Sequence, residues 1–157
     1  MIITEAEITH LFEKFGSSRV LVVGDVMIDA YLSGKVDRIS PEAPVPVVAL
    51  KKRNNMLGGA ANVALNIKAL GAEAILCSVI GNDKQGDEML NLMKNAGLSD
   101  AGIIRSDKRI TTTKFRIIGN RMQMLRIDEE IDTDLDQIDA AAILHRISGL
   151  LTTHKPD

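Results

Sequence analysis

Two continuous apolar runs, each closed by a glycine, constrain the fold of this chain more than any other feature. The runs cover residues 20–23 and 74–80 and are rich in valine, isoleucine and leucine; Gly24 and Gly81 follow them directly. Such runs are typical of strands buried on both faces, as in a parallel sheet covered by helices. Helical patterns follow at 59–70 and 85–96, ended by Gly71 and Gly97. This order of strand and helix predicts right-handed βαβ units.

A further helix is expected near each end of the chain. Thr4 and Glu7 have the spacing of a capping box, and apolar residues recur at helical intervals after them until Gly16. A last helix is predicted over about 135–151, after the acidic stretch 128–136.

The segment 31–50 differs from both runs because it holds three prolines, at positions 41, 44 and 46. Proline removes a backbone donor and fixes φ, which excludes a helix and a central strand and leaves extended, edge-like structure. Val45, Val47 and Ala49 alternate with other residues. This alternation predicts a strand that buries one face only and stands apart from the main core.

Residues 111–118 and 122–127 read as two more strands. Gly119-Asn120-Arg121 separates them, and such a turn favours a β-hairpin.

Composition limits the classes of function. With 157 residues, 45% of them hydrophobic, the chain is long enough to bury one core and falls in the single-domain range. The net charge of −2 gives no electrostatic footprint for nucleic acid or an anionic membrane. No apolar stretch approaches a membrane-spanning length, and residues 1–10 are too acidic for a signal peptide, so a cytoplasmic location is expected.

The single cysteine, Cys77, lies inside the second apolar run. It cannot form an internal disulfide, and its neighbours predict a small buried hydrophobic residue rather than a nucleophile.

Gly58 and Gly59 precede an alanine-rich helix that carries Asn62 in its first turn. Two glycines allow a ligand to approach the backbone closely, free N–H groups at a helix start can meet ligand oxygens, and an asparagine offers both a donor and an acceptor. This is what recognition of a sugar hydroxyl requires. A tight strand-to-helix turn without a ligand is the alternative interpretation of the same glycines.

The spacing from Gly58 and Asn62 to Gly71 and Gly81 resembles the first signature of the ribokinase-like (PfkB) carbohydrate kinases, with every position filled. Gly24-Asp25-Val26-Met27-Ile28-Asp29 is similar to that family's strand-end segment, in which a carboxylate chelates sugar hydroxyls. The resemblance places Asp29 in that role. A carboxylate just beyond the carboxyl end of a parallel strand also lies where α/β sheets bind ligands; a solvated loop acid or helix cap is the alternative.

Residues 38–47, with their prolines, most resemble the heptose-7-phosphate kinases of lipopolysaccharide-core biosynthesis, in many bacteria fused to an adenylyltransferase. The resemblance covers essentially the whole chain. It implies an α/β fold: the N-terminal part of a Rossmann-like α/β/α ribokinase domain over residues 1–157, with a small β-sheet lid formed by about 31–50 and 111–127. It also implies a homodimer in which the lids of two subunits pair.

A sugar that already carries a phosphate needs a cationic contact. Lys114 and Arg116 project from one face of a strand because alternate residues point the same way. Arg38 precedes the proline-rich segment, and Arg126 lies on the second hairpin strand. Arginine suits bidentate phosphate recognition, so these residues are candidate ligands; solvated surface charges are the alternative.

The resemblance implies transfer of the ATP γ-phosphate to the anomeric hydroxyl of D-glycero-D-manno-heptose 7-phosphate. In the family, a later Gly-Ala-Gly-Asp motif supplies the anion hole and the base, and this sequence contains no such motif. We therefore expect no catalytic residue here, and expect ATP and Mg²⁺ to be held mainly by a missing half. The chain alone is expected to bind sugar poorly, transfer no phosphate and self-associate through its open sheet edge.

Two alternatives remain open at this stage. One is another ribokinase-like kinase, acting on ribose, fructose or a nucleoside; the other is a non-catalytic dimerisation or binding module. A dinucleotide-binding Rossmann motif is excluded because residues 24–29 lack the second and third glycines.

Overall fold

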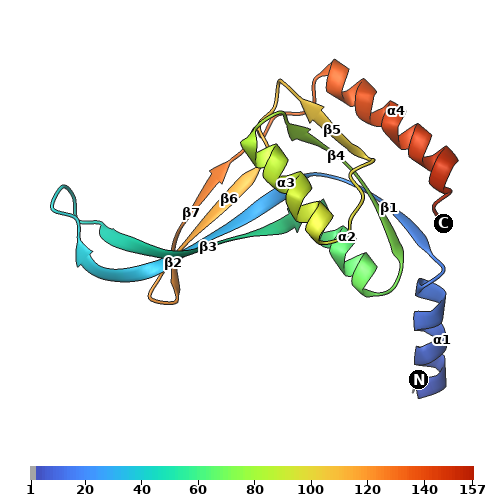
Figure 1. Cartoon of the computed structure of the whole chain (residues 1–157), viewed down its shortest axis with the longest axis horizontal. Coiled ribbons are helices and arrows are strands. Elements are labelled where there is room, and N and C mark those ends of the chain that lie inside the picture. The colour runs from blue at the N-terminus through green and yellow to red at the C-terminus, as the bar shows by residue number, and fades with distance from the viewer. Residues whose placement is uncertain (1–2) are drawn as a thin grey trace.

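The chain forms a layered α/β body from which a long β-sheet projects (Figure 1). The structure is a computed structural model that describes residues 3–157. The helices are α1 (Glu5–Phe15), α2 (Ala60–Ala69), α3 (Lys84–Asn95) and α4 (Gln137–His154). The strands are β1 (Arg19–Val23), β2 (Val26–Ile39), β3 (Pro46–Gly59), β4 (Glu73–Gly81), β5 (Ile103–Ser106), β6 (Thr113–Gly119) and β7 (Met122–Glu129).

The body has three layers around a parallel sheet of order β1-β4-β5. One core cluster joins the sheet to α2 and α3, through Ala61, Ala64, Leu76 and Met89 among others. A smaller cluster on the other face joins Ile75 and Cys77 to α4. The predicted α/β/α architecture and the two parallel strands are confirmed, but only β4 is buried as predicted; no residue of β1 is buried, and Val23 at its end is 49% exposed. β5 was not predicted, because four residues with a charged one among them give no periodic signal.

The second sheet, which we call the lid, has the order β3-β2-β6-β7. Strand β2 pairs antiparallel with β3 and parallel with β6, and β6 pairs antiparallel with β7. In Figure 1 the β2–β3 hairpin extends furthest from the body. Pro46 begins an edge strand, as the proline pattern predicts. The lid strands begin closer to the body than expected, so Asp29 and Gly58 lie within β2 and β3 and not in loops of the body.

The predicted hairpin at 119–121 is confirmed. Asn120 and Arg121 join β6 to β7 with φ of 50° and 70°, the left-handed pair of a type I′ turn. The Asn120 side chain also donates to the Val36 carbonyl at 3.0 Å and accepts from the Val36 N–H at 3.2 Å. The tip of one hairpin is thus tied to the middle of the other.

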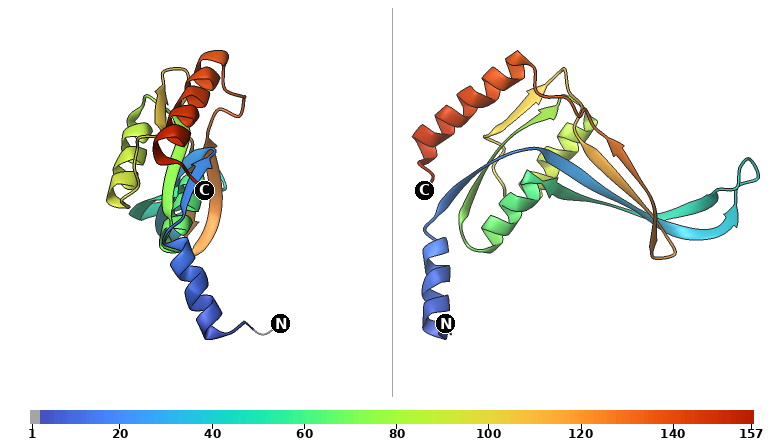
Figure 2. Two further views of the ribbon diagram at one scale, coloured as in Figure 1. Left: turned by 90° about the vertical axis from the view of Figure 1, so that its right-hand side faces the viewer. Right: turned by 180° about the vertical axis from the view of Figure 1, so that it is seen from behind.

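Helix α1 begins with the predicted capping box, formed by Thr4 and Glu7. None of its residues is buried, and it stands away from the body in both views of Figure 2. The last helix runs two to three residues later than predicted. None of the described helices combines the length and apolar character that crossing a bilayer would require.

Cys77 is fully buried in β4, as predicted. Burial raises the pKa of its thiol, which disfavours the nucleophilic thiolate. Its role in the described structure is packing.

Asp83 connects α3 to the start of β6. Its carboxylate caps α3 by accepting from the Gly86 N–H at 2.6 Å, and it accepts from the Thr111 N–H at 2.7 Å and hydroxyl at 2.8 Å. Burial opposes ionisation, but the hydrogen bonds from Thr111 and Gly86 outweigh it and lower the pKa of Asp83. The charged carboxylate therefore holds the body and the lid in register.

Replacing Asp83 by alanine should lower the free energy of unfolding by about 3 kcal/mol, because a cap and two further hydrogen bonds are lost. A group with a depressed native pKa stabilises the fold above its unfolded pKa of about 3.9 and loses that effect as pH falls through the native value. Urea unfolding should therefore show the gap between wild type and variant closing below about pH 4. Asp136→Ala, which removes the cap of α4 and an exposed ion pair with Lys108, should cost about 1 kcal/mol. An equal loss in both variants would contradict the connecting role.

Candidate functional site

A cavity of about 460 Å³ lies where the carboxyl ends of β1 and β4 meet the lid. Asp25 and Ser78 line it from the body, Met27 and Lys114 from the lid, and residues 130–135 from the loop before α4. Ligands of open α/β sheets bind at this edge of the sheet. The cavity is therefore the natural place for a substrate under the lid.

Asp29 and Arg116 form an ion pair on the lid. Arg116 donates from Nε at 3.1 Å and from Nη2 at 2.6 Å, both to Oδ1 of Asp29. The two side chains are only 20% and 24% exposed, and the guanidinium carbon lies 5.7 Å from the centre of the Tyr31 ring. Asp29 is paired in register with Lys114, which lines the cavity. Asp29 is not itself a lining residue; its carboxylate lies one strand away from Lys114, with Oδ2 free of this arginine.

Gly58 and Gly59 are both required by their surroundings. A β-carbon on Gly58 would lie 2.8 Å from Asp29 Oδ2, and one on Gly59 would lie 2.3 Å from the Asp25 carbonyl oxygen. Gly59 has φ of 58°, and the same Asp25 oxygen accepts from the Ala60 N–H at 2.9 Å. The glycine pair thus lets β3 turn into α2 directly beside the Asp29 carboxylate.

Lys114 and Arg126 are bound to carboxylates on neighbouring strands. Lys114 Nζ donates to Asp128 and to Glu130, both at 2.9 Å. The hydrogen bond to Asp128, followed by the one to Glu130, raises the pKa of Lys114. The hydrogen bond from Lys114 in turn lowers the pKa of Asp128. Arg126 pairs in register with Arg116 and is half exposed, and among residues 3–157 its side chain bonds only to Asp128. Of the three predicted cations near Asp29, it is the most exposed.

Two predicted residues lie apart from this cluster. Asn62 is exposed in the first turn of α2, next in sequence to the glycine pair but outside the cavity lining. Arg38 is exposed near the far end of β2, nine residues from Asp29. A strand rises about 3.3 Å per residue, so the two are separated by roughly 30 Å. The structure brings together Asp29, Gly58, Gly59, Lys114, Arg116 and Arg126, but not Asn62 or Arg38.

Sequence reasoning missed two residues that shape the cavity. Arg109 donates to the carbonyl oxygens of Ile131, Thr133 and Asp134 at 2.8–3.3 Å and so fixes the wall in front of α4. Asp25 lines the cavity and accepts from Ala60. A lone arginine after an irregular segment carries no local signal. Asp25 lies in the same strand-end segment as Asp29, and nothing in the sequence shows that both carboxylates belong to the site.

The arrangement can accept hydrogen bonds from hydroxyl groups through Asp29 and attract an anion through Arg126 and Lys114. Within residues 3–157 no group of three or more histidine, cysteine or carboxylate side chains could hold a metal ion. The described residues therefore fit recognition and orientation of a polar substrate.

Comparison with known proteins agrees with this geometry. The profile of the pfkB family carbohydrate kinases matches residues 17–156. Proteins named bifunctional protein HldE are 46% identical over 142 residues in Desulfatibacillum aliphaticivorans and in Pseudomonas aeruginosa LESB58, covering 89% and 90% of this chain. The Helicobacter pylori P12 relative is 48% identical over 118 residues, 75% of this chain. The chain spans 26–29% of the length of these relatives.

Solved structures of similar fold include a carbohydrate kinase from Agrobacterium tumefaciens, with a TM-score of 0.58 and 22% identity over 71% of this chain and 35% of that one. A ribokinase from Thermotoga maritima has a TM-score of 0.53 and 22% identity, over 73% of this chain and 36% of that one. A nucleoside kinase from Methanocaldococcus jannaschii has a TM-score of 0.54 and 19% identity, over 71% of this chain and 36% of that one. At these identities the likeness establishes the fold alone.

Proposed function

The chain belongs to the pfkB family of carbohydrate kinases, and we propose that it forms the sugar-binding and lid part of a kinase for D-glycero-D-manno-heptose 7-phosphate. The observation that carries the proposal is the Asp29–Arg116 pair, packed against Gly58 beside the cavity at the sheet edge. A fixed carboxylate with one free oxygen is suited to accept hydrogen bonds from sugar hydroxyls. The high identity to the HldE proteins, the relatives that the heptose interpretation predicts, supports the choice of sugar.

The proposed reaction moves the γ-phosphoryl group of ATP to the anomeric oxygen of the sugar. The new bond joins that oxygen to phosphorus, the bond from phosphorus to the bridging oxygen of ADP breaks, and the hydroxyl proton passes to a base. We assign neither that base nor a Mg²⁺ ligand to residues 3–157, which hold no metal-binding cluster. The proposed tasks of this chain are to orient the sugar and to keep water from it.

The 7-phosphate is proposed to meet Arg126 first, with Lys114 adding charge at the cavity rim. Both cations already face carboxylates, so the phosphate would compete with Asp128 for Arg126. Arginine favours such an exchange because its planar fork offers five donors. Asn62 is proposed to reach a hydroxyl from the start of α2, whereas Arg38 could reach a sugar only on a second subunit.

We further propose that two lids pair in a homodimer and that the protein acts in the cytoplasm. Leu50, Met56, Leu125 and Ile127 are large apolar residues of the lid, each about half exposed. Contact between two lids would cover such surface. The proposed division is one kinase part over residues 1–157, with the lid formed by β2, β3, β6 and β7.

A second candidate is a kinase for another sugar or a nucleoside, since both kinds of enzyme occur among the structural neighbours. The cations beside Asp29 favour a substrate that already carries a phosphate.

To test the function, residues 1–157 would replace the aligned part of the P. aeruginosa relative, and ADP release would be followed. We expect ADP release that depends on the heptose phosphate and exceeds that with ribose, fructose or adenosine. Arg126→Gln should raise KM for the heptose phosphate about tenfold, because a charge-assisted hydrogen bond is lost. Arg19→Gln, at the far end of β1, is the matched control and should leave KM unchanged.

An equally active chimera that prefers ribose or a nucleoside would reject the heptose assignment. A chimera that folds but releases no ADP with any sugar, while the parent enzyme does, would reject the kinase role of this chain.

A further inference from the structure

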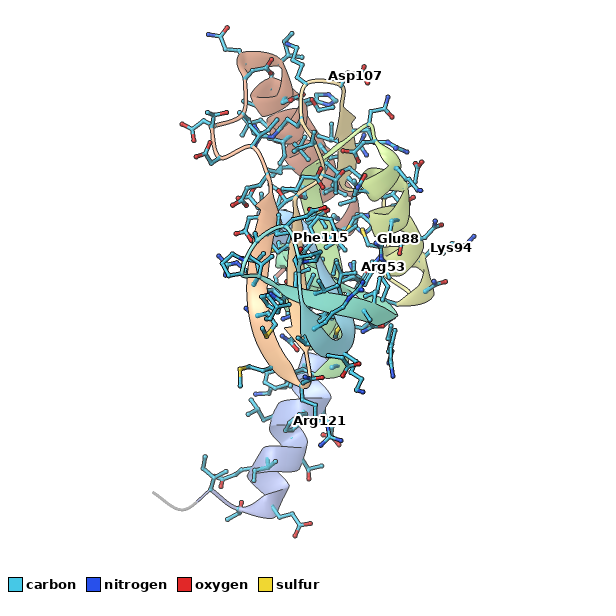
Figure 3. The ribbon with its side chains drawn as sticks, turned by 90° about the vertical axis from the view of Figure 1, so that its left-hand side faces the viewer. Arg53, Glu88, Lys94, Asp107, Phe115 and Arg121 are labelled. Carbon is cyan, nitrogen blue, oxygen red and sulfur yellow. The ribbon has the colours of Figure 1, made fainter. Side chains whose placement is uncertain are left out.

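A second cavity, of about 420 Å³, lies between the lid and α3. Its apolar floor is formed by Ile28, Ala30 and Phe115, and its polar wall by Arg53 and Asn55 of β3 and by α3. Arg53, Glu88 and Phe115 are labelled together beside α3 in Figure 3. Side chains alternate along a strand, so Ile28 and Ala30 point away from the face that carries Asp29. This cavity, which we call the α3 cavity, is therefore separate from the proposed sugar site.

Outside its one ion pair, the α3 cavity has an excess of one positive charge, because Arg53 and Lys84 are cations and Glu88 keeps its negative charge beside the neutral Asn55. Of its two carboxylates, Asp87 bonds to Arg105 at 2.7 Å and Glu88 accepts from Asn55 at 3.0 Å. Arg53 and Lys84 line the same wall, are exposed, and have no carboxylate partner among residues 3–157. Lys84 is also the first residue of α3, where the helix dipole adds positive potential. An entering ligand would thus find two unpaired cations.

Asn55 supplies an unsatisfied acceptor. Its Nδ2 donates to Glu88, and a carboxylate can only accept, so the orientation of the amide is fixed. The other end, Oδ1, is the one buried side-chain polar atom in residues 3–157 without a hydrogen-bond partner. Leaving such an oxygen unpaired costs about 1–3 kcal/mol. A hydroxyl that enters beside Asn55 could pair with it after a small movement of the side chain.

We propose that the α3 cavity binds a small hydroxylated ring that carries an anionic group, the chemical class of the sugar phosphates. The ring lies on the floor formed by Phe115, Ile28 and Ala30, the anion contacts Arg53 and Lys84, and a hydroxyl donates to Asn55. The volume lies within the range of small-molecule sites, and the combination of an apolar floor with few polar groups is typical of them. The inference does not depend on the proposed function.

The side-chain amides of Asn55, Gln85 and Asn91 line the cavity and report on it directly in ¹H–¹⁵N NMR spectra of the full chain. Mannose 6-phosphate should shift these signals saturably, and more than mannose, inorganic phosphate or AMP. Arg53→Gln and Lys84→Gln should each weaken this binding about tenfold, because each removes a charge-assisted contact. Lys94→Gln, also on α3 but outside the lining, is the matched control and should leave it unchanged.

The same titration of Asp29→Asn separates the two sites, since the α3 cavity should keep its response when the proposed sugar site is altered. No saturable shift at Asn55, a shift that Arg53→Gln leaves unchanged, or a shift lost in Asp29→Asn would each overturn the proposal. A larger response to AMP would overturn the assignment to sugar phosphates.

Discussion

Replacing Gly59 by alanine is expected to lower the free energy of unfolding by about 4 kcal/mol. The residue has φ of 58° and ψ of −136°, a conformation that costs any other residue about 1–3 kcal/mol. The added β-carbon would also lie 2.3 Å from the Asp25 carbonyl oxygen, so the backbone must move. That oxygen accepts from Ala60, and the movement would therefore break the link between β1 and α2.

Gly149→Ala is the matched control for this substitution. Gly149 lies in α4, is exposed, and has no atom within 4 Å of an added β-carbon. Alanine is the better helix former, so this variant should gain about 0.5–1 kcal/mol. Urea unfolding measures both. A Gly59→Ala variant within about 0.5 kcal/mol of wild type would show that the turn adapts and that the glycine is not required.

Local chemistry explains why much of the fold could be predicted. Some elements can be predicted from a few neighbouring residues: the strands from the two apolar runs, the start of α1 from the capping box at Thr4, and the hairpin from the turn at Asn120. The proline pattern also placed β3 at a sheet edge, because a missing N–H is tolerated only there. These signals predict the parallel strands and helices of the body and the existence of further strands outside it, which form the second sheet.

The internal arrangement of the site depends on contacts between distant segments. Arg116 meets Asp29 across 87 residues, because β6 pairs in parallel with β2. Nothing local to Asp29 indicates that its strand already belongs to the second sheet, since Met27-Ile28-Asp29 follows the apolar run and Gly24, where a loop is expected. The pairing of distant segments also explains why Arg116 is predicted as a phosphate ligand, although the structure shows its guanidinium bonded to Asp29. The hydrogen bonds from Arg109 to the loop before α4 are likewise contacts between distant segments, which the sequence does not indicate.

Replacing Asp29 by asparagine is expected to lower kcat/KM of the chimeric kinase about 100-fold, if Asp29 accepts sugar hydroxyls as proposed. The substitution keeps the size of the side chain but removes the charge that holds Arg116. Asp128 is the other carboxylate near Arg116, and it already bonds to Lys114 and Arg126. Among the described residues, the freed guanidinium would therefore find no unbonded carboxylate to replace Asp29. Activity with heptose 7-phosphate and with the unphosphorylated heptose should fall together.

Arg116→Met then separates two roles of the arginine. Both of its bonds go to a single oxygen of Asp29, which favours a positioning role in which Arg116 fixes the carboxylate and leaves Oδ2 to the sugar. In that role, the variant should lose about tenfold in kcat/KM with either sugar, and Asp29→Asn combined with it should cost little more than Asp29→Asn alone. If Arg116 instead binds the 7-phosphate, kcat/KM would fall only with the phosphorylated sugar. The losses caused by Arg116→Met and Asp29→Asn would then be additive in free energy. Arg126→Gln provides the comparison, because its effect should depend on the phosphate.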